Sequence, residues 1–133
     1  MNTGNKHKRI FIAGGGGFIG GHLAKVLIEH GHTVVVADIK PFDQWYQLNA
    51  QAENHSANME HRENCFKLME GCDEVYCLAC NMGGMGFIEN NKSLCMLSVL
   101  INTHMLEAAK HLKVSKYFYS SSACIYPDYK QTD

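Results

Sequence analysis

A run of glycines near the start of the chain has the residue types and spacing to hold a phosphate group. Gly14, Gly17 and Gly20 follow the pattern G-x-x-G-x-x-G, and other registers, including G-x-G-x-x-G, also fit because the residues around them are largely glycine. The run lies between an apolar segment, 10–13, and a segment with helical spacing, 23–30. A glycine turn between a strand and a helix points backbone N–H groups and the positive end of the helix dipole at a pyrophosphate. The sequence therefore predicts a dinucleotide site.

A carboxylate stands where such a site would contact a ribose. Asp38 ends a second apolar and β-branched segment, 33–37, roughly 20 residues after the turn, and can accept hydrogen bonds from both hydroxyls of an adenosine ribose. Its negative charge would repel a 2′-phosphate, so Asp38 favours NAD over NADP, while the nearby Lys40 argues the other way. The alternative interpretation is an ordinary strand-end or turn residue.

Hydroxyl and thiol side chains follow another predicted strand, 116–121. One of the serines 120–122 could bond a substrate hydroxyl during hydride transfer, or the three could form a turn. Cys124 could be a general acid/base if a cation or a helix N-terminus lowered its pKa, and the alternative is a small buried apolar side chain. Residues 126–130 match Y-x-x-x-K, but Pro127 disfavours the helix that this pair needs, so we interpret the match as coincidence.

The elements that must position these residues alternate between strand and helix. This alternation predicts an α/β fold, a doubly wound parallel sheet (Rossmann-like) that stops after about five strands, in the order 3-2-1-4-5. Ligands of such sheets lie beyond the carboxyl ends of the strands, where the turn, Asp38, a loop at 81–86 and residues 121–124 converge. The expected strands are 10–13, 33–37, a poorly marked one near 53–59, 74–78 and 116–121. The expected helices are one that includes 23–30, one at 63–70 and one at about 90–111, the last with Leu94, Leu97, Ile101, Met105 and Ala108 on one face.

Composition limits the other classes of function. The chain has 133 residues, 46% of them hydrophobic, and a net charge of −1, so it lacks the basic character of a protein that binds nucleic acid or an anionic membrane. No apolar segment approaches the roughly 20 residues that span a bilayer, and no secretory signal is evident, so we expect a cytoplasmic protein with free thiols. The C-x-x-C at 77–80 has no second pair, so no metal site is predicted. We divide the chain into a tail, 1–8, and one domain, 9–133.

Two segments resemble a known family closely. They are Asn-Met-Gly-Gly-Met-Gly-Phe-Ile at 81–88 and Ser-Ser-Ala-Cys-Ile-Tyr-Pro at 121–127. Together with the glycine turn and Asp38, they resemble the extended short-chain dehydrogenases/reductases, which include nucleotide-sugar epimerases and dehydratases, and among these the GDP-mannose 3,5-epimerases. The resemblance runs from about Arg9 to Gln131 and covers only the N-terminal part, less than half, of a family member.

The resemblance implies an NAD-dependent epimerisation of a GDP-mannose-type nucleotide sugar. In that family NAD⁺ takes a hydride from C4 of the mannose ring, the resulting ketone acidifies C3 and C5, a Cys and a Lys exchange protons there, and the hydride returns. By resemblance, Cys124 is the catalytic acid/base, and Gly83, Ser122, Ala123 and Cys124 contact the substrate. By resemblance also, Gly14, Gly17, Phe18, Ile19 and Gly20 bind the pyrophosphate, Asp38 the ribose, Asn58 and Met59 the adenine, and Leu78 and Ala79 line the NAD cleft.

The chain departs from this family at several points. Asn58 replaces an Asp, and Cys80 and Asn81 replace Ala and Asp. The family's Y-x-x-x-K helix, its acid/base Lys and its GDP-binding domain would all follow Asp133. We therefore expect an NAD-binding fragment that is inactive alone. A homodimer, if one forms, is expected only for a full-length form. The alternatives are another nucleotide-sugar 4-epimerase or 4,6-dehydratase, in which Cys124 would be incidental, and a non-catalytic NAD-binding protein.

Overall fold

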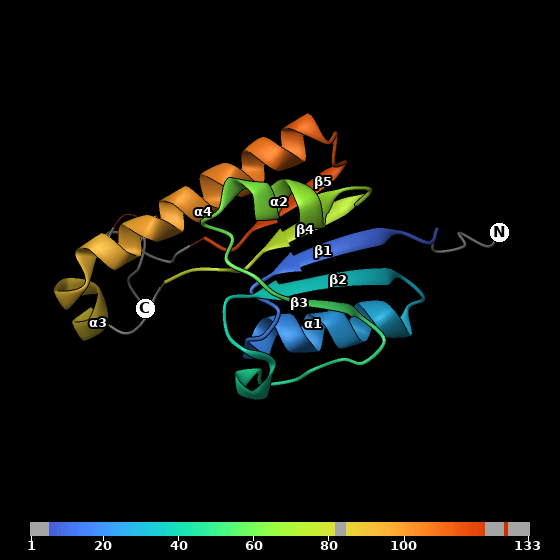
Figure 1. The fold of residues 1–133 in the computed structure, drawn as a ribbon, viewed down its shortest axis with the longest axis horizontal. Helices are drawn as coiled ribbons and strands as arrows, with labels where there is room; N and C mark the ends of the chain where they lie inside the picture. Colours follow the sequence, from blue (N-terminus) through green and yellow to red (C-terminus); the bar gives the residue numbers. More distant parts are fainter. Residues whose placement is uncertain (1–5, 82–84, 122–126, 128–133) are drawn as a thin grey trace.

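A parallel sheet forms the centre of the structure, a computed structural model that describes residues 6–81, 85–121 and 127 (Figure 1). Neighbouring strands are all parallel and follow the order β3-β2-β1-β4-β5. The predicted doubly wound fold and its strand order are therefore confirmed. The strands are β1 (Arg9–Ala13), β2 (Thr33–Asp38), β3 (Glu53–Ser56), β4 (Glu74–Cys77) and β5 (Lys116–Tyr119).

The sequence of each strand matches its place in the sheet. β1 and β2 are central and buried on both faces, which is why they read as continuous apolar runs, with Phe11 opposite Val35 and Ala13 opposite Ala37. β3 lies at one edge and is the polar segment Glu-Asn-His-Ser, half-buried at most. An edge strand pairs on one side only, and polar residues there discourage pairing with other chains. This strand was expected near 53–59 and ends at Ser56.

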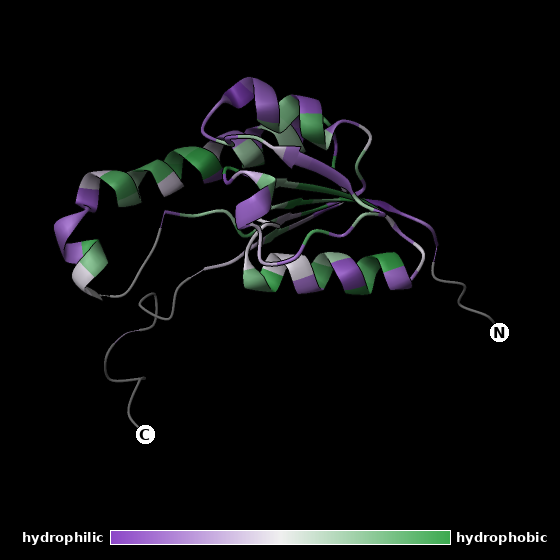
Figure 2. Ribbon diagram, turned by 60° about the horizontal axis from the view of Figure 1, so that its bottom comes forward, coloured by the Kyte–Doolittle hydropathy of each residue, from purple (hydrophilic) through white to green (hydrophobic). Residues whose placement is uncertain are grey.

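Helices cover the two faces of the sheet and form two cores (Figures 1 and 2). On one face, α1 (Phe18–Glu29) packs over β1 and β2 through Ala24, against Ile12 and Val36. On the other face, α2 (Arg62–Met69) and α4 (Lys92–His111) pack together over the sheet. The larger core on that side includes Phe11, Val35, Met69, Val75, Met105 and Ala108.

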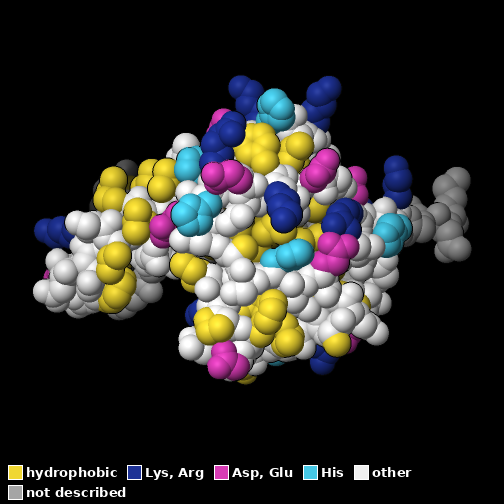
Figure 3. Space-filling view, viewed as in Figure 1, with side chains coloured by type: hydrophobic (Ala, Val, Ile, Leu, Met, Phe, Trp, Pro, Cys, Tyr) yellow, Lys and Arg dark blue, Asp and Glu magenta, His cyan; other side chains and the backbone are white. Residues whose placement is uncertain are grey.

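The long helix differs from the prediction at its start. A short helix, α3 (Met85–Asn90), begins inside the expected loop 81–86, and α4 then starts at Lys92. Ile101, Met105 and Ala108 face the core as predicted, whereas Leu94 is 45% exposed, because this end of α4 extends beyond the sheet (Figure 1). Apolar side chains are also exposed on the outer side of α4, namely Met96, Val99, Leu100 and Leu106 (Figure 3). Within the described residues, we find no helix with the length and apolar character to cross a membrane.

Candidate functional site

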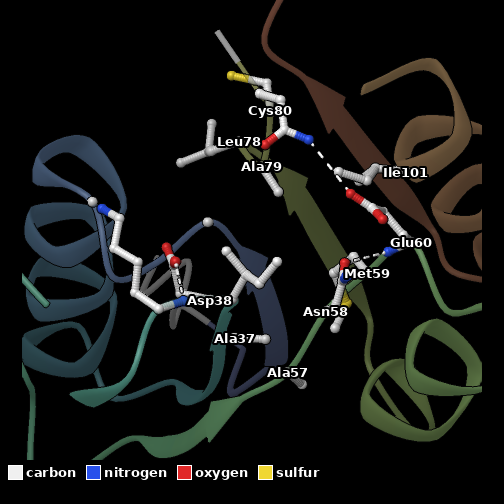
Figure 4. A pocket seen from close by; sticks show the side chains of 15 residues that line it. Ala37, Asp38, Ala57, Asn58, Met59, Glu60, Leu78, Ala79, Cys80 and Ile101 are labelled. Carbon is white, nitrogen blue, oxygen red and sulfur yellow. Dashed lines mark hydrogen bonds between the residues drawn. The ribbon is translucent and has the colours of Figure 1, made fainter. Parts of the chain in front are cut away.

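A pocket of about 290 Å³ opens at the carboxyl ends of β1, β2 and β4 (Figure 4). This is the edge of a doubly wound sheet where ligands bind. The pocket brings together most of the residues predicted to bind the cofactor, namely Gly14, Gly17, Asp38, Asn58, Met59, Leu78 and Ala79. Three predicted residues do not line it: the side chains of Phe18 and Ile19 are 59% and 68% exposed on the outside of α1, and Gly20 is buried behind the turn.

The glycine turn is packed too tightly for side chains. Gly14 has a φ of +86°, and a Cβ there would lie 2.7 Å from the backbone nitrogen of Ala79 at the end of β4. A Cβ at Gly20 would lie 2.5 Å from the carbonyl oxygen of Gly14. The turn is held to β2 because the N–H groups of Gly14 and Gly15 both donate to the carbonyl of Ala37, at 2.7 and 3.1 Å. Gly14 and Gly20 therefore let the turn lie against β4 and α1 at once.

The N-terminus of α1 is open to an anion. Gly17 is its N-cap residue, so no side chain caps the helix, and the first turn carries no acidic residue. The first N–H groups of a helix have no partner within the helix and carry its positive partial charge. Gly17 also lines the pocket, so this positive end borders it.

The Asp38 carboxylate is fixed by backbone groups rather than by a cation. Its Oδ2 accepts a hydrogen bond of 3.0 Å from the N–H of Gly16, and its Oδ1 accepts one of 3.1 Å from the N–H of Lys40. Asp38 is 8% exposed and lines the pocket. A carboxylate has about four lone-pair positions, so two such bonds orient it and leave capacity for two further donors.

The opposite wall of the pocket is an apolar slot (Figure 4). Met59 follows β3, Leu78 and Ala79 follow β4, and Ile101 projects from α4. Met59 and Ile101 are buried. The Oδ1 of Asn58 already accepts a 2.9 Å hydrogen bond from the N–H of Glu60. Apolar walls with a few polar groups at the rim suit a flat heterocyclic ring.

The sequence analysis missed several residues that line the pocket. Glu60 and Asn81 both line the pocket and are joined by a 3.4 Å hydrogen bond from the Asn81 amide to Glu60 Oε1. The Asn81 N–H donates to Ser98 Oγ at 2.8 Å. Cys80 also lines the pocket, and burial raises the pKa of its thiol, which keeps it protonated at neutral pH. In the sequence, Glu60 and Cys80 adjoin predicted site residues, and Asn81 belongs to the loop 81–86 that was expected at this edge of the sheet. The others missed are Ala37, Ile39, Lys40, Ala57 and Ile101.

The predicted substrate contacts lie outside the described residues. These are Gly83, Ser122, Ala123 and the catalytic candidate Cys124. In the described part of the chain, no group of three or more His, Cys, Asp or Glu residues could hold a metal ion. The site that the structure describes is therefore the part formed by the turn, Asp38 and the apolar slot.

Known proteins resemble this chain in sequence and in fold. The family model "NAD dependent epimerase/dehydratase family" matches residues 10–133. The chain is 43% identical to GDP-mannose 3,5-epimerase 1 of Oryza sativa subsp. japonica, over 94% of this chain and 33% of that protein. It is 41% identical to GDP-mannose 3,5-epimerase of Arabidopsis thaliana, over 97% of this chain and 34% of that protein. The chain thus spans about a third of the length of these curated relatives. Among solved structures, an epimerase of Methanothermobacter thermautotrophicus has the same fold, with a TM-score of 0.78 and 23% identity over 89% of this chain and 36% of that one.

Proposed function

This chain belongs to the NAD dependent epimerase/dehydratase family, and we propose that its pocket binds the adenosine diphosphate half of NAD. The N-terminus of α1 would hold the diphosphate, because the first N–H groups of the helix have no partner within it, and the side-chain-free glycine turn would let the diphosphate approach closely. Asp38 would accept the two hydroxyls of the adenosine ribose, and the slot between Met59, Ala79 and Ile101 would take the adenine. When bound, NAD supplies a hydride acceptor that can return the hydride.

The observation that carries this proposal is the bond between the turn and the carboxylate. The N–H of Gly16 donates to Asp38 Oδ2 at 3.0 Å, so the phosphate-binding and ribose-binding parts are one connected unit beside one pocket. The other residues serve to exclude water: Met59 and Ile101 give the pocket a dry wall. Asp38 carries a negative charge that a 2′-phosphate would meet directly, so the pocket should prefer NAD to NADP.

We further propose that the whole protein to which this sequence relates is a nucleotide-sugar epimerase of the GDP-mannose 3,5-epimerase type. Its support is the 43% and 41% identity to two such plant enzymes and the two segments at 81–88 and 121–127. In this proposal Cys124 moves a proton at the sugar, and Gly83, Ser122 and Ala123 contact a GDP-mannose-type substrate. Residues 9–133 act as the NAD-binding domain and 1–8 as a tail, in a cytoplasmic protein that forms a homodimer in a full-length form and binds neither nucleic acid nor membrane.

Calorimetric titration of the chain with NAD and with NADP tests the cofactor proposal. We expect wild type to bind NAD more tightly than NADP. Asp38→Asn should weaken NAD binding about 10- to 100-fold, because a hydrogen bond to a charged group is lost and an amide N–H₂ would face a backbone N–H. Glu53→Gln, at the other end of the sheet, is the control and should leave NAD affinity unchanged. Equal affinity of wild type for NAD and NADP, or an Asp38→Asn variant with wild-type NAD affinity, would contradict the assignment.

The activity is tested by incubating the 133-residue chain with GDP-mannose and NAD⁺ and analysing the sugar products. We expect no epimerisation, because the second acid/base group that the resemblance implies would follow Asp133. In a full-length form, Cys124→Ala should stop epimerisation at C3 and C5 without changing NAD affinity. A Cys124→Ala variant that kept the rate would remove the acid/base role from this thiol.

A further inference from the structure

The chain's single tryptophan is buried against the glycine turn. Trp45 is 8% exposed and lies in the connection between β2 and β3, outside the glycine and aspartate motifs. A Cβ at Gly16 would lie 2.9 Å from Cδ1 of this indole and 2.9 Å from Cγ of Asp38. Gly16 is therefore packed closely against both the tryptophan ring and the carboxylate that we assign to the ribose.

A chain of hydrogen bonds joins the indole to the same carboxylate. The indole N–H donates to the carbonyl of Lys40 at 2.9 Å, and Ser56 Oγ donates to that carbonyl at 3.1 Å. The N–H of Lys40 in turn donates to Asp38 Oδ1 at 3.1 Å. The two bonds at the Lys40 carbonyl restrict the backbone on either side of this residue, so they orient the N–H that holds Asp38.

The segment that carries the tryptophan also holds the other side of the turn. The N–H of Tyr46 donates to the carbonyl of Gly16 at 2.9 Å, while the N–H of Gly16 donates to Asp38 Oδ2. A short 3₁₀ helix, η1 (Phe42–Gln44), brings the chain back toward the turn, with the N–H of Trp45 bonded to the carbonyl of Phe42 at 3.2 Å. Gly16 is thus held through both of its backbone polar groups, one by Asp38 and one by the residue after Trp45.

We propose that Trp45 is a positioning residue that sets the cofactor selectivity of this pocket, an inference that rests on the proposed NAD site. Trp45 does not line the pocket, and it acts through Lys40 and Asp38. With the indole in place, the Asp38 carboxylate is fixed to accept two ribose hydroxyls. Without its N–H, the backbone at Lys40 is less restrained, the carboxylate can turn away from the hydroxyls, and a 2′-phosphate is repelled less.

The test compares the ratio of the dissociation constants of NADP and NAD between variants, by calorimetry. Trp45→Phe keeps an aromatic ring and removes the indole N–H, and it should lower this ratio about five- to tenfold, as expected for one lost hydrogen bond. Because the chain has one tryptophan, growth of a tryptophan auxotroph on β-(3-benzothienyl)alanine replaces that N–H with sulfur in a side chain of nearly the same shape. This protein should show the same fall in the ratio even if Trp45→Phe does not fold.

Two controls separate positioning from a general structural role. Tyr46→Ala removes the neighbouring exposed ring but keeps the backbone bond to Gly16, and should leave the ratio unchanged. In an Asp38→Asn background, removal of the indole N–H should have no further effect on the ratio, because Trp45 acts through that carboxylate. If removal of the indole N–H weakened the binding of NAD and of NADP equally, this inference would be overturned while the proposed function would stand. The same holds if the ratio fell as much in the Asp38→Asn background as in wild type. Wild type that binds neither cofactor would overturn the proposed function, and this inference with it.

Discussion

The two ends of the sheet hold their carboxylates in different ways. At the amino ends of the strands, Glu74 is 6% exposed and lies 2.5 Å from Lys8 Nζ and 3.8 Å from Lys116 Nζ. Arg9 binds Glu53 there with two parallel hydrogen bonds of 2.8 and 2.7 Å. Figure 3 shows side chains of both charges together near the N-terminus. At the carboxyl ends, Asp38 accepts hydrogen bonds from two backbone N–H groups. Among the described residues, it has no ion-pair partner.

This difference separates groups that stabilise the fold from groups that can bind a ligand. A carboxylate that faces a lysine or an arginine has its charge balanced within the protein, so its effect is on the free energy of unfolding. A carboxylate that is oriented by backbone N–H groups keeps its charge and part of its hydrogen-bonding capacity for a ligand. Substitutions at the amino ends should therefore change stability and leave NAD affinity unchanged, whereas those at the carboxyl ends should change NAD affinity.

The largest effect should come from Gly14→Ala, compared with Gly31→Ala. Both glycines have a positive φ, +86° and +84°, but a Cβ at Gly14 would clash with the backbone of β4, whereas a Cβ at Gly31 would have nothing within 4 Å. Gly14→Ala should destabilise the fold by about 3 kcal/mol, from strain and overpacking together, and abolish NAD binding. Gly31→Ala should cost about 1 kcal/mol and leave NAD affinity unchanged. Urea unfolding and calorimetry measure both, and equal losses would show that packing at the turn does not matter.

Glu74→Gln should reduce stability without affecting NAD binding. Burial alone would raise the pKa of Glu74, but its hydrogen bond to Lys8 and the charges of Lys116 and Lys8 outweigh burial, so its pKa is lowered in the fold. The resulting stability is fully present above the unfolded pKa, near 4.5, and is lost as the pH falls through the lower folded value. At pH 7 the variant should be about 1–2 kcal/mol less stable than wild type, and the difference should shrink below pH 4. A difference that stayed constant down to pH 2.5 would contradict this.

Asn81→Asp should have the smallest effect, and it places an unbalanced charge at the binding end. The new carboxylate would stand where the Asn81 amide now donates to Glu60 Oε1, 3.4 Å away. Repulsion between the two should weaken NAD binding about threefold at pH 7. Asn81→Ser lacks the charge and is the control. If both variants lowered NAD affinity equally, the hydrogen bond rather than the charge would be responsible.

The sequence predicted those parts of the molecule whose structure is indicated by a local pattern of residues. The apolar runs of β1 and β2 predicted buried strands, and the glycine run predicted a turn between a strand and a helix; both are confirmed. Asp38 was found because it ends a strand at a fixed distance from the turn. These patterns are local, so they can be recognised without any knowledge of tertiary contacts.

The rest depended on contacts between segments far apart in the chain. Trp45 lies in a polar stretch without period, and its importance comes from Gly16, nearly 30 residues earlier, which no local pattern reveals. Helical spacing placed Ile101 on the inner face of α4, but a period does not say that this position borders a pocket rather than the core. β3 was poorly marked because it pairs on one side only, so its polar residues carry little strand signal.

The central claim is that NAD binds at the carboxyl ends of β1, β2 and β4. Titration of the isotope-labelled chain with NAD, followed through its backbone amide NMR signals, tests it most directly. We expect saturable shifts at Gly14–Gly17, Asp38, Met59 and Ala79, with none at Arg9, Glu53 or Glu74 at the opposite end. Shifts centred on the amino ends of the strands, or no shift at millimolar NAD in a folded chain, would contradict it.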